Sequence, residues 1–227
     1  MDYSPLWLSL KVALLATIFT FILGILAAWL TVKLKRGKGI VDGLFTLPLV
    51  LPPTIVGFFL LVIFGKNSFI GEFLSEIGAP VVFTWVGAVI ASTVVAFPLM
   101  YRTARGAFEQ LDENLLSAGR TLGMKERTLF LKIMLPNSIP SIMAGAVLAF
   151  ARALGEFGAT IMLAGNIPGR TQTVSVAIYT AVQAGNWDLA YRWMFIIVVI
   201  SFVTILAMNA WTRYAARFRR ESKRLWR

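Results

Sequence analysis

The chain has 227 residues, of which 58% are hydrophobic and only 15% are charged, and its mean hydropathy is +0.75. Soluble domains are roughly half apolar and a quarter charged, so this composition is typical of a membrane protein. The sequence contains neither Cys nor His. This excludes thiol nucleophiles, disulfides, imidazole bases and the usual transition-metal ligands. We therefore expect no catalytic residue, no metal site and no cofactor on this chain.

Five apolar segments are long enough to cross a membrane. A helix needs about 20 residues to span about 30 Å of hydrocarbon, and a 25.1 kDa soluble core would not bury five of them. We expect an all-α integral membrane protein with about five transmembrane helices. No basic region precedes the first segment, so we expect it to remain as a span and not to be removed as a signal peptide. The expected spans are Leu6–Val32, Gly43–Phe64, Val82–Met100, Ile139–Leu163 and Met194–Trp211.

The basic residues predict the orientation of these spans. The chain has 22 Lys and Arg against 11 Asp and Glu, a net charge of +11. Most of the basic residues lie at 33–38, at 102–132 and in the tail 213–227. Five spans place these regions on one side, and an excess of Lys and Arg marks the cytoplasmic side. We expect the N-terminus outside, a basic cytoplasmic tail at 213–227, and the lipid bilayer, not nucleic acid, as the partner of this charged chain.

The second expected span carries Pro48, Pro52 and Pro53. Proline removes a backbone donor and bends a helix. Inside a membrane, the freed carbonyl groups are tolerated only where protein or water satisfies them. Pro52 and Pro53 are therefore candidates for a transport pathway, although an ordinary membrane-helix kink would also explain them.

The loop at 102–137 has apolar residues at helical spacing on both sides of Gly123. We expect one helix over Arg105–Leu122 and a second over Lys125–Leu135, with a hinge at Gly123 and an end at Pro136. Such a pair suits the groove of a partner protein. An amphipathic pair lying on the bilayer surface and a DNA-binding helix-turn-helix are the alternatives.

The fourth span carries two charges, Arg152 and Glu156, at i, i+4 spacing on one helical face together with Thr160. A charge at this depth costs at least about 2.5–3.5 kcal/mol on insertion scales, so it usually faces a bundle interior or an aqueous path. Arg152, Glu156 and Thr160 are candidates for the pathway or its gate. The alternative is a structural ion pair that holds two helices together. After this span, Thr171–Ala184 is too short and polar to cross, and we expect an external helix or a re-entrant segment there.

The loop resembles the cytoplasmic signature of permease subunits of ATP-binding-cassette importers. That signature reads Glu-Ala-Ala, three residues, Gly, nine residues, Ile-x-Leu-Pro. Ser stands here for the Glu and Gly for the second Ala, while the later positions match in register. The resemblance assigns ATPase coupling to Ser117, Ala118, Gly119, Gly123, Ile133, Leu135 and Pro136.

Further segments resemble the permeases of molybdate importers in particular, and sulfate permeases are similar. They are Leu47–Pro53, Ala96–Met100, Ala151–Thr160 and Asn166–Gly169. The resemblance implies a type I importer permease with one transmembrane domain over 1–227 in a bacterial inner membrane. It also implies a second copy of the chain, two cytoplasmic ATPase subunits that bind ATP and Mg, and an external or periplasmic oxyanion-binding protein.

The chain itself has no G-x-x-x-x-G-K-[ST] nucleotide-binding loop. We therefore expect a transport subunit that is not an enzyme and that draws its energy from a partner ATPase. The resulting hypothesis is an ATP-driven importer of molybdate or tungstate. A sulfate or thiosulfate permease is the nearest alternative. An ATP-independent channel or carrier and an intramembrane enzyme are the others.

Overall fold

A computed structural model describes residues 2–224, apart from the side chains of 208, 209 and 211–224. The basic side chains expected at 213–227 lie outside the described residues. Throughout the described part, the secondary structure is helical. The helices are α1 (Ser4–Lys33), α2 (Lys38–Val50), α3 (Pro53–Phe64), α4 (Phe69–Glu76), α5 (Trp85–Glu109), α6 (Glu113–Thr121), α7 (Glu126–Leu129), the π-helix η1 (Phe130–Met134), α8 (Leu135–Leu154), α9 (Gly158–Ala164), α10 (Val174–Gln183) and α11 (Trp187–Arg224).

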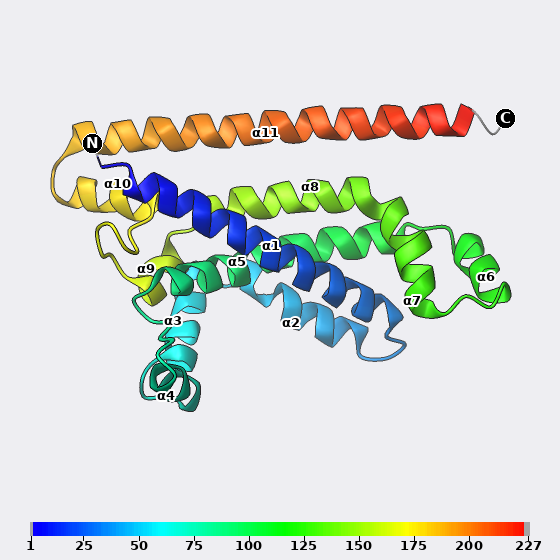
Figure 1. The fold of residues 1–227 in the computed structure, drawn as a ribbon, viewed down its shortest axis with the longest axis horizontal. Coiled ribbons are helices and arrows are strands. Elements are labelled where there is room, and N and C mark those ends of the chain that lie inside the picture. Colours follow the sequence, from blue (N-terminus) through cyan, green and yellow to red (C-terminus); the bar gives the residue numbers. More distant parts are fainter. Residues whose placement is uncertain (1, 225–227) are drawn as a thin grey trace.

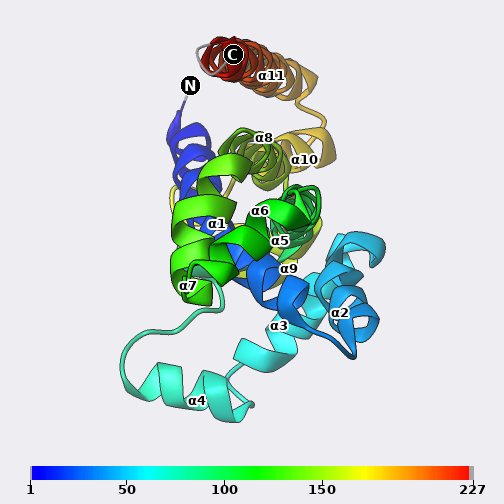
Figure 2. The same cartoon turned by 90° about the vertical axis from the view of Figure 1, so that its right-hand side faces the viewer.

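Helices α1, α5 and α8 pack side by side and form the core of the molecule (Figures 1 and 2). Small residues at their contacts allow the backbones to approach closely, as is common in membrane helices. A Cβ atom on Gly24 of α1, for example, would lie only 2.8 Å from the Cγ atom of Met100 in α5. The buried alanines of this core are Ala13, Ala16, Ala28, Ala96, Ala104, Ala146, Ala149 and Ala153.

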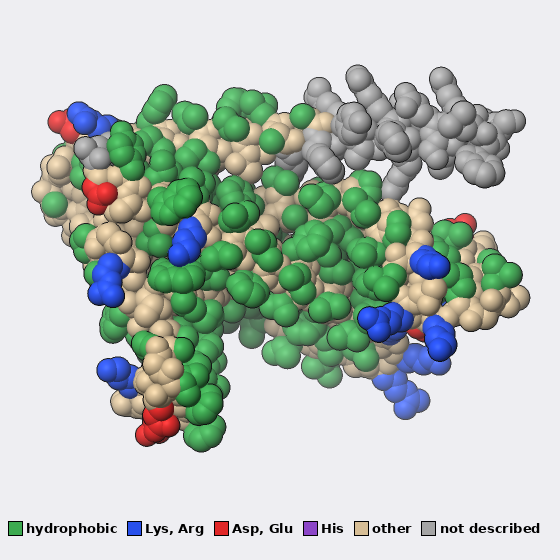
Figure 3. Space-filling view, in the orientation of Figure 1, with side chains coloured by type: hydrophobic (Ala, Val, Ile, Leu, Met, Phe, Trp, Pro, Cys, Tyr) green, Lys and Arg blue, Asp and Glu red, His purple; other side chains and the backbone are tan. Residues whose placement is uncertain are grey.

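Hydrophobic side chains cover most of the face seen in Figure 3, while a group of Lys and Arg marks the end that holds α6 and α7. Within the described part, four helical segments are long and apolar enough to cross a membrane. The pair α2 and α3 forms a fifth segment that bends by 110°. The all-α membrane fold with about five spans is thereby confirmed.

The expected span over Gly43–Phe64 is present as a bent pair of helices, and its prolines interrupt the helix where a bend was expected. Helix α2 ends at Val50, and α3 starts at Pro53 in a new direction. Leu51 and Pro52 between them have extended backbone, with ψ of 142° and 134°. Two consecutive prolines explain the break, because each removes a donor and the first disfavours helical backbone in the residue before it.

The fourth span also differs from the expected Ile139–Leu163. The chain remains helical from Glu126, through α7, η1 and α8, to Leu154. Pro136 therefore does not end the second loop helix, because the chain passes from η1 into α8 through this residue without a break. At the other end, Gly155 stops α8 and α9 begins at Gly158.

The expected helix in Thr171–Ala184 is present as α10 and ends before Gly185, whose φ is +70°. It lies at the end of the molecule opposite α6 (Figure 1). The Ser9 hydroxyl of α1 accepts a hydrogen bond of 2.8 Å from the backbone N–H of Val174, which ties α10 to the start of the chain. Helix α11 then runs back toward the end that carries α6 (Figure 1).

Candidate functional site

The two breaks in the membrane helices lie against each other. A Cβ atom on Gly158, the first residue of α9, would lie 3.0 Å from the Cβ atom of Pro53 and 3.2 Å from the backbone nitrogen of Thr54. One turn further, a Cβ atom on Gly57 would come within 2.7 Å of the Cα atom of Ala159. The backbones of α3 and α9 are thus in direct contact, which brings two segments about a hundred residues apart in the sequence to one place.

Glu156 lies in the break between α8 and α9 and uses both carboxylate oxygens. One oxygen pairs with the Arg152 guanidinium at 2.7 Å, and the other accepts a 2.8 Å hydrogen bond from the backbone N–H of Ala159. Glu156 is 2% exposed, whereas the Arg152 side chain is 31% exposed. The expectation that both charges lie in the middle of one continuous helix is therefore wrong. They pair across a helix end, and Glu156 also caps the first turn of α9.

The remaining pathway candidates lie beside these breaks. Pro52 is exposed and Pro53 is half-buried at the start of α3. Thr160 lies in α9 and is fully buried, and its hydroxyl has no hydrogen-bond partner within the described part of the chain. The structure thus gathers Arg152, Glu156, Pro52, Pro53 and Thr160 around one junction of broken helices.

Most of the second group of candidates lies in α6, α7, η1 and the turn between α6 and α7, which we call the coupling arm, while Leu135 and Pro136 lie in the first turn of α8. Ser117 and Ala118 are exposed on α6, whereas Gly119 is buried against the second half of the arm. A Cβ atom on Gly119 would lie 2.5 Å from Leu129 Cδ1 and 3.3 Å from Ile133 Cδ1. Gly119 therefore lies against Leu129 and Ile133 across the arm, and a side chain added at position 119 would require the Leu129 side chain to move.

Gly123 forms the turn between the halves of the arm, with φ of +76°, a conformation that favours glycine. Leu122 beside it is 82% exposed, so the tip of the turn presents an apolar side chain. Arg120 and Glu126 form a 2.8 Å ion pair across the turn, and the carboxylate raises the pKa of the Arg120 guanidinium. The arm is thus a tight turn that an exposed ion pair spans. Its first helix also differs from the expected Arg105–Leu122, because α5 continues to Glu109 and α6 starts at Glu113.

A network of charged side chains joins α2 to α5. The sequence-based prediction used charges in this region only to assign the orientation. Arg105 pairs with Asp42 and also donates a 3.0 Å hydrogen bond to Glu109. Lys38, at the start of α2, pairs with the same Glu109 at 2.6 Å. The i, i+4 spacing of Arg105 and Glu109 was visible in the sequence, but their partners on α2 depend on tertiary contacts.

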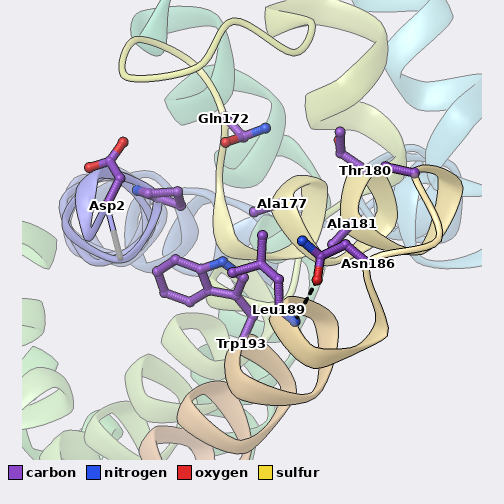
Figure 4. Close-up of a pocket in the computed structure, with 10 residues that line it drawn as sticks. Asp2, Gln172, Ala177, Thr180, Ala181, Asn186, Leu189 and Trp193 are labelled. Atoms are coloured by element: carbon purple, nitrogen blue, oxygen red, sulfur yellow. Dashed lines mark hydrogen bonds between the residues drawn. The ribbon is translucent and has the colours of Figure 1, made fainter.

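A pocket of about 370 Å³ opens at the opposite end of the molecule, between the start of α1, α10 and the start of α11. Figure 4 shows Asp2, Gln172 and Asn186 around this pocket, with Trp193 and Leu189 below them. The side chain of Gln172 is held by Asn166, to which it donates a 2.9 Å hydrogen bond. This end therefore offers a concave, largely apolar surface beside α10 with a few polar side chains at it.

The arrangement of helices is that of permease subunits of ATP-binding-cassette importers. A bacterial transporter involved in the import of the acidic polysaccharide alginate matches with a TM-score of 0.74, 18% identity, and coverage of 93% of this chain and 78% of that one. The methionine transporter MetNI in an inward-facing conformation matches with a TM-score of 0.73, 17% identity, and coverage of 92% and 94%. The type I permease fold expected from the sequence is confirmed.

Sequence comparison places the chain in a family. Residues 20–221 match the binding-protein-dependent transport system inner membrane components, and the chain belongs to this family of multi-pass inner-membrane proteins. It is 51% identical to the putative molybdenum transport system permease YvgM of Bacillus subtilis, with coverage of 89% of this chain and 90% of that one. It is 44% identical to the molybdenum permease ModB of Escherichia coli (97% and 96%) and 33% identical to the sulfate permease CysT of Salmonella typhimurium (88% and 73%).

Proposed function

We propose that this chain is the pore-forming subunit of an ATP-driven importer of molybdate or tungstate. The observation that carries the proposal is the high identity to molybdenum permeases along nearly the whole of both chains. The sulfate permease is less similar and is covered over only 73% of its length. A sulfate or thiosulfate permease is therefore the second candidate.

The coupling arm is the proposed docking site for an ATPase subunit that holds ATP and Mg. Three features support this assignment: the exposed Ser117 and Ala118, the apolar tip at Leu122, and the ion pair that spans the turn. An arm of this kind fits a groove as an amphipathic helix does. Two copies of the chain, each with its own ATPase, would enclose the pathway, and ATP binding would draw the two arms together.

The helical connection from α7 to Leu154 gives that movement a route into the membrane. Helix α8 begins at the arm and ends at Arg152 and Glu156, so a displacement of the arm moves the junction of broken helices. The partly exposed Arg152 would attract a divalent oxyanion. Glu156 holds one side of the guanidinium and would keep the oxyanion from binding too tightly.

The end opposite the arm is the proposed external face, where a binding protein would deliver the oxyanion beside α10. The basic residues near the arm support this orientation, because Lys and Arg mark the cytoplasmic side. The pocket that carries Asp2, Gln172 and Asn186 among mainly apolar lining residues lies at the proposed external end.

The proposal is tested by molybdate uptake into proteoliposomes that contain this chain, its ATPase and its binding protein. We expect uptake that requires all three proteins and ATP and that persists in excess sulfate. Strong competition by sulfate would move the substrate assignment to the sulfate group. Uptake by this chain alone would contradict ATP coupling and indicate a channel or a carrier.

A further inference from the structure

The root of the coupling arm contains a π-helical turn, η1, at Phe130–Met134. Such turns are rare and are frequently found at functional sites. The residues at both junctions, Leu129 and Leu135, keep right-handed helical backbone, so η1 is continuous with α7 and with α8. A movement of α7 is therefore passed along the helix and is not absorbed by a flexible linker.

Two adjacent side chains at this root face different parts of the molecule. Leu129 is fully buried beneath α6, against Gly119. Phe130 is 6% exposed and places its ring between Trp29 of α1 and Phe108 of α5. Consecutive residues of a helix point about 100° apart, so neighbouring side chains contact different partners. Leu129 thus joins the root to the arm, and Phe130 joins it to two membrane spans.

The contacts of Phe130 are close ring contacts, and we call Trp29, Phe108 and Phe130 the aromatic clasp. The Phe130 ring centroid lies 4.7 Å from that of Trp29 and 5.7 Å from that of Phe108, with the second pair edge to face at 77°. The Trp29 ring also contacts a neighbour in its own helix, because the Lys33 ammonium lies 3.6 Å from its ring centroid. Aromatic pairs prefer particular geometries with ring centroids about 4.5–7 Å apart, so the three rings hold one another in a defined arrangement.

We propose that Phe130 is a positioning residue that transmits movement of the coupling arm to α1 and α5 through the aromatic clasp. This inference rests on the proposed function, because it needs an ATPase that moves the arm. Without the ring, α6 still presents its docking surface and ATP is still hydrolysed. The movement then reaches α1 and α5 only through the packing of α8 against them, and no longer directly at the root of the arm. ATP use and transport should therefore separate.

The test compares ATP hydrolysis and molybdate uptake in the same proteoliposomes, with the complete complex carrying Phe130→Ala. We expect the molybdate taken up per ATP hydrolysed to fall about tenfold or more, because small misplacements far from a site have effects of this size. Trp29→Ala should lower the same ratio. The double variant should be no worse than the more affected single variant, because both substitutions break one contact.

Phe130→Tyr keeps the ring and is expected to retain coupling, whereas Phe130→Met fills the space without a ring and serves if the alanine variant does not assemble. Phe45→Ala is the matched control. It removes two ring contacts of similar size, at 5.5 Å to Phe97 and 5.2 Å to Tyr101, away from the arm. Its coupling ratio should equal that of the unaltered complex.

Parallel loss of hydrolysis and uptake in the Phe130 variants would overturn the inference, since it would indicate a structural role only. An unchanged coupling ratio would overturn it as well. Failure of the unaltered complex to take up any tested oxyanion with ATP would instead refute the proposed function, so the two failures are distinguishable.

Discussion

Glu156 pairs with the charge of Arg152 and also accepts a hydrogen bond from the start of α9. Its carboxylate neutralises Arg152 and accepts the N–H of Ala159, one of the backbone donors that a helix start leaves without a partner. Removing one partner of a buried ion pair costs far more than replacing both, because the remaining charge stays buried and unpaired. Comparing a single with a double substitution therefore distinguishes an ion pair that only stabilises the fold from one that acts in the transport pathway.

Arg152→Ala should lower the free energy of unfolding by about 2–4 kcal/mol, somewhat less than a fully buried pair because the guanidinium is partly exposed. Thermal unfolding in detergent measures this loss. The double variant Arg152→Met with Glu156→Gln should recover most of the stability, since the glutamine still accepts the N–H of Ala159. We expect oxyanion uptake by the double variant to remain low. Recovered uptake would show that the pair acts as a brace and not in the pathway.

At the scale of helices, the packing of α3 on α9 depends on positions that have no side chain. This contact lies directly after the breaks that precede α3 and α9, so it helps to set the directions of these two short helices. Gly57 lies so close to the backbone and a side chain of α9 that a methyl group added at this position has no space.

Gly57→Ala should destabilise the protein by about 1–3 kcal/mol through overpacking, measured as a lower unfolding temperature and reduced uptake. Gly43→Ala is the matched control. It adds the same methyl group to the other half of the bent span, where nothing lies within 4 Å. Equal stability of the two variants would contradict the close packing of α3 and α9.

The turn at Gly123 makes a prediction for the coupling arm. Gly123→Val places a β-branched residue at φ of +76°, which costs about 1–3 kcal/mol of local strain, and should distort the arm. We expect less oxyanion uptake per ATP hydrolysed. Gly123→Asn should be tolerated better, because Asn adopts left-handed backbone more readily. Full coupling in the valine variant would count against docking through this arm.

At the scale of the whole molecule, the two ends differ in charge and in structure. One end carries the coupling arm and the basic linker after α1, and the other carries α10 and the pocket beside it (Figures 1 and 3). The chain has no cysteine, so a single introduced thiol can be followed without background.

We expect a membrane-impermeant maleimide to label Gln183→Cys on intact cells and to label Gly39→Cys only after the membrane is opened. Both positions are exposed, and a Cβ atom at Gly39 meets nothing within 4 Å. The reverse pattern would place the coupling arm outside and contradict both the orientation and the ATPase partner.

Much of the architecture was predictable because it depends on the properties of single residues or on the total hydrophobicity of a segment. Hydrophobic length identifies the spans, since lipid demands about 20 apolar residues for each helix. The turn at Gly123 was visible because one left-handed glycine needs no distant partner. Arg152 and Glu156 were recognisable as a pair because charges are costly in an apolar segment.

Local sequence features thus identified the membrane class, the approximate number of spans and the turn at Gly123. The consecutive prolines also mark the break at Pro52, whereas the single prolines Pro48, Pro98 and Pro140 lie inside helices. The meeting of the two breaks and the contacts of Phe130 with Trp29 and Phe108 appear only in the folded chain. Helical periodicity describes one helix at a time, while these features arise from close contact between segments far apart in the chain.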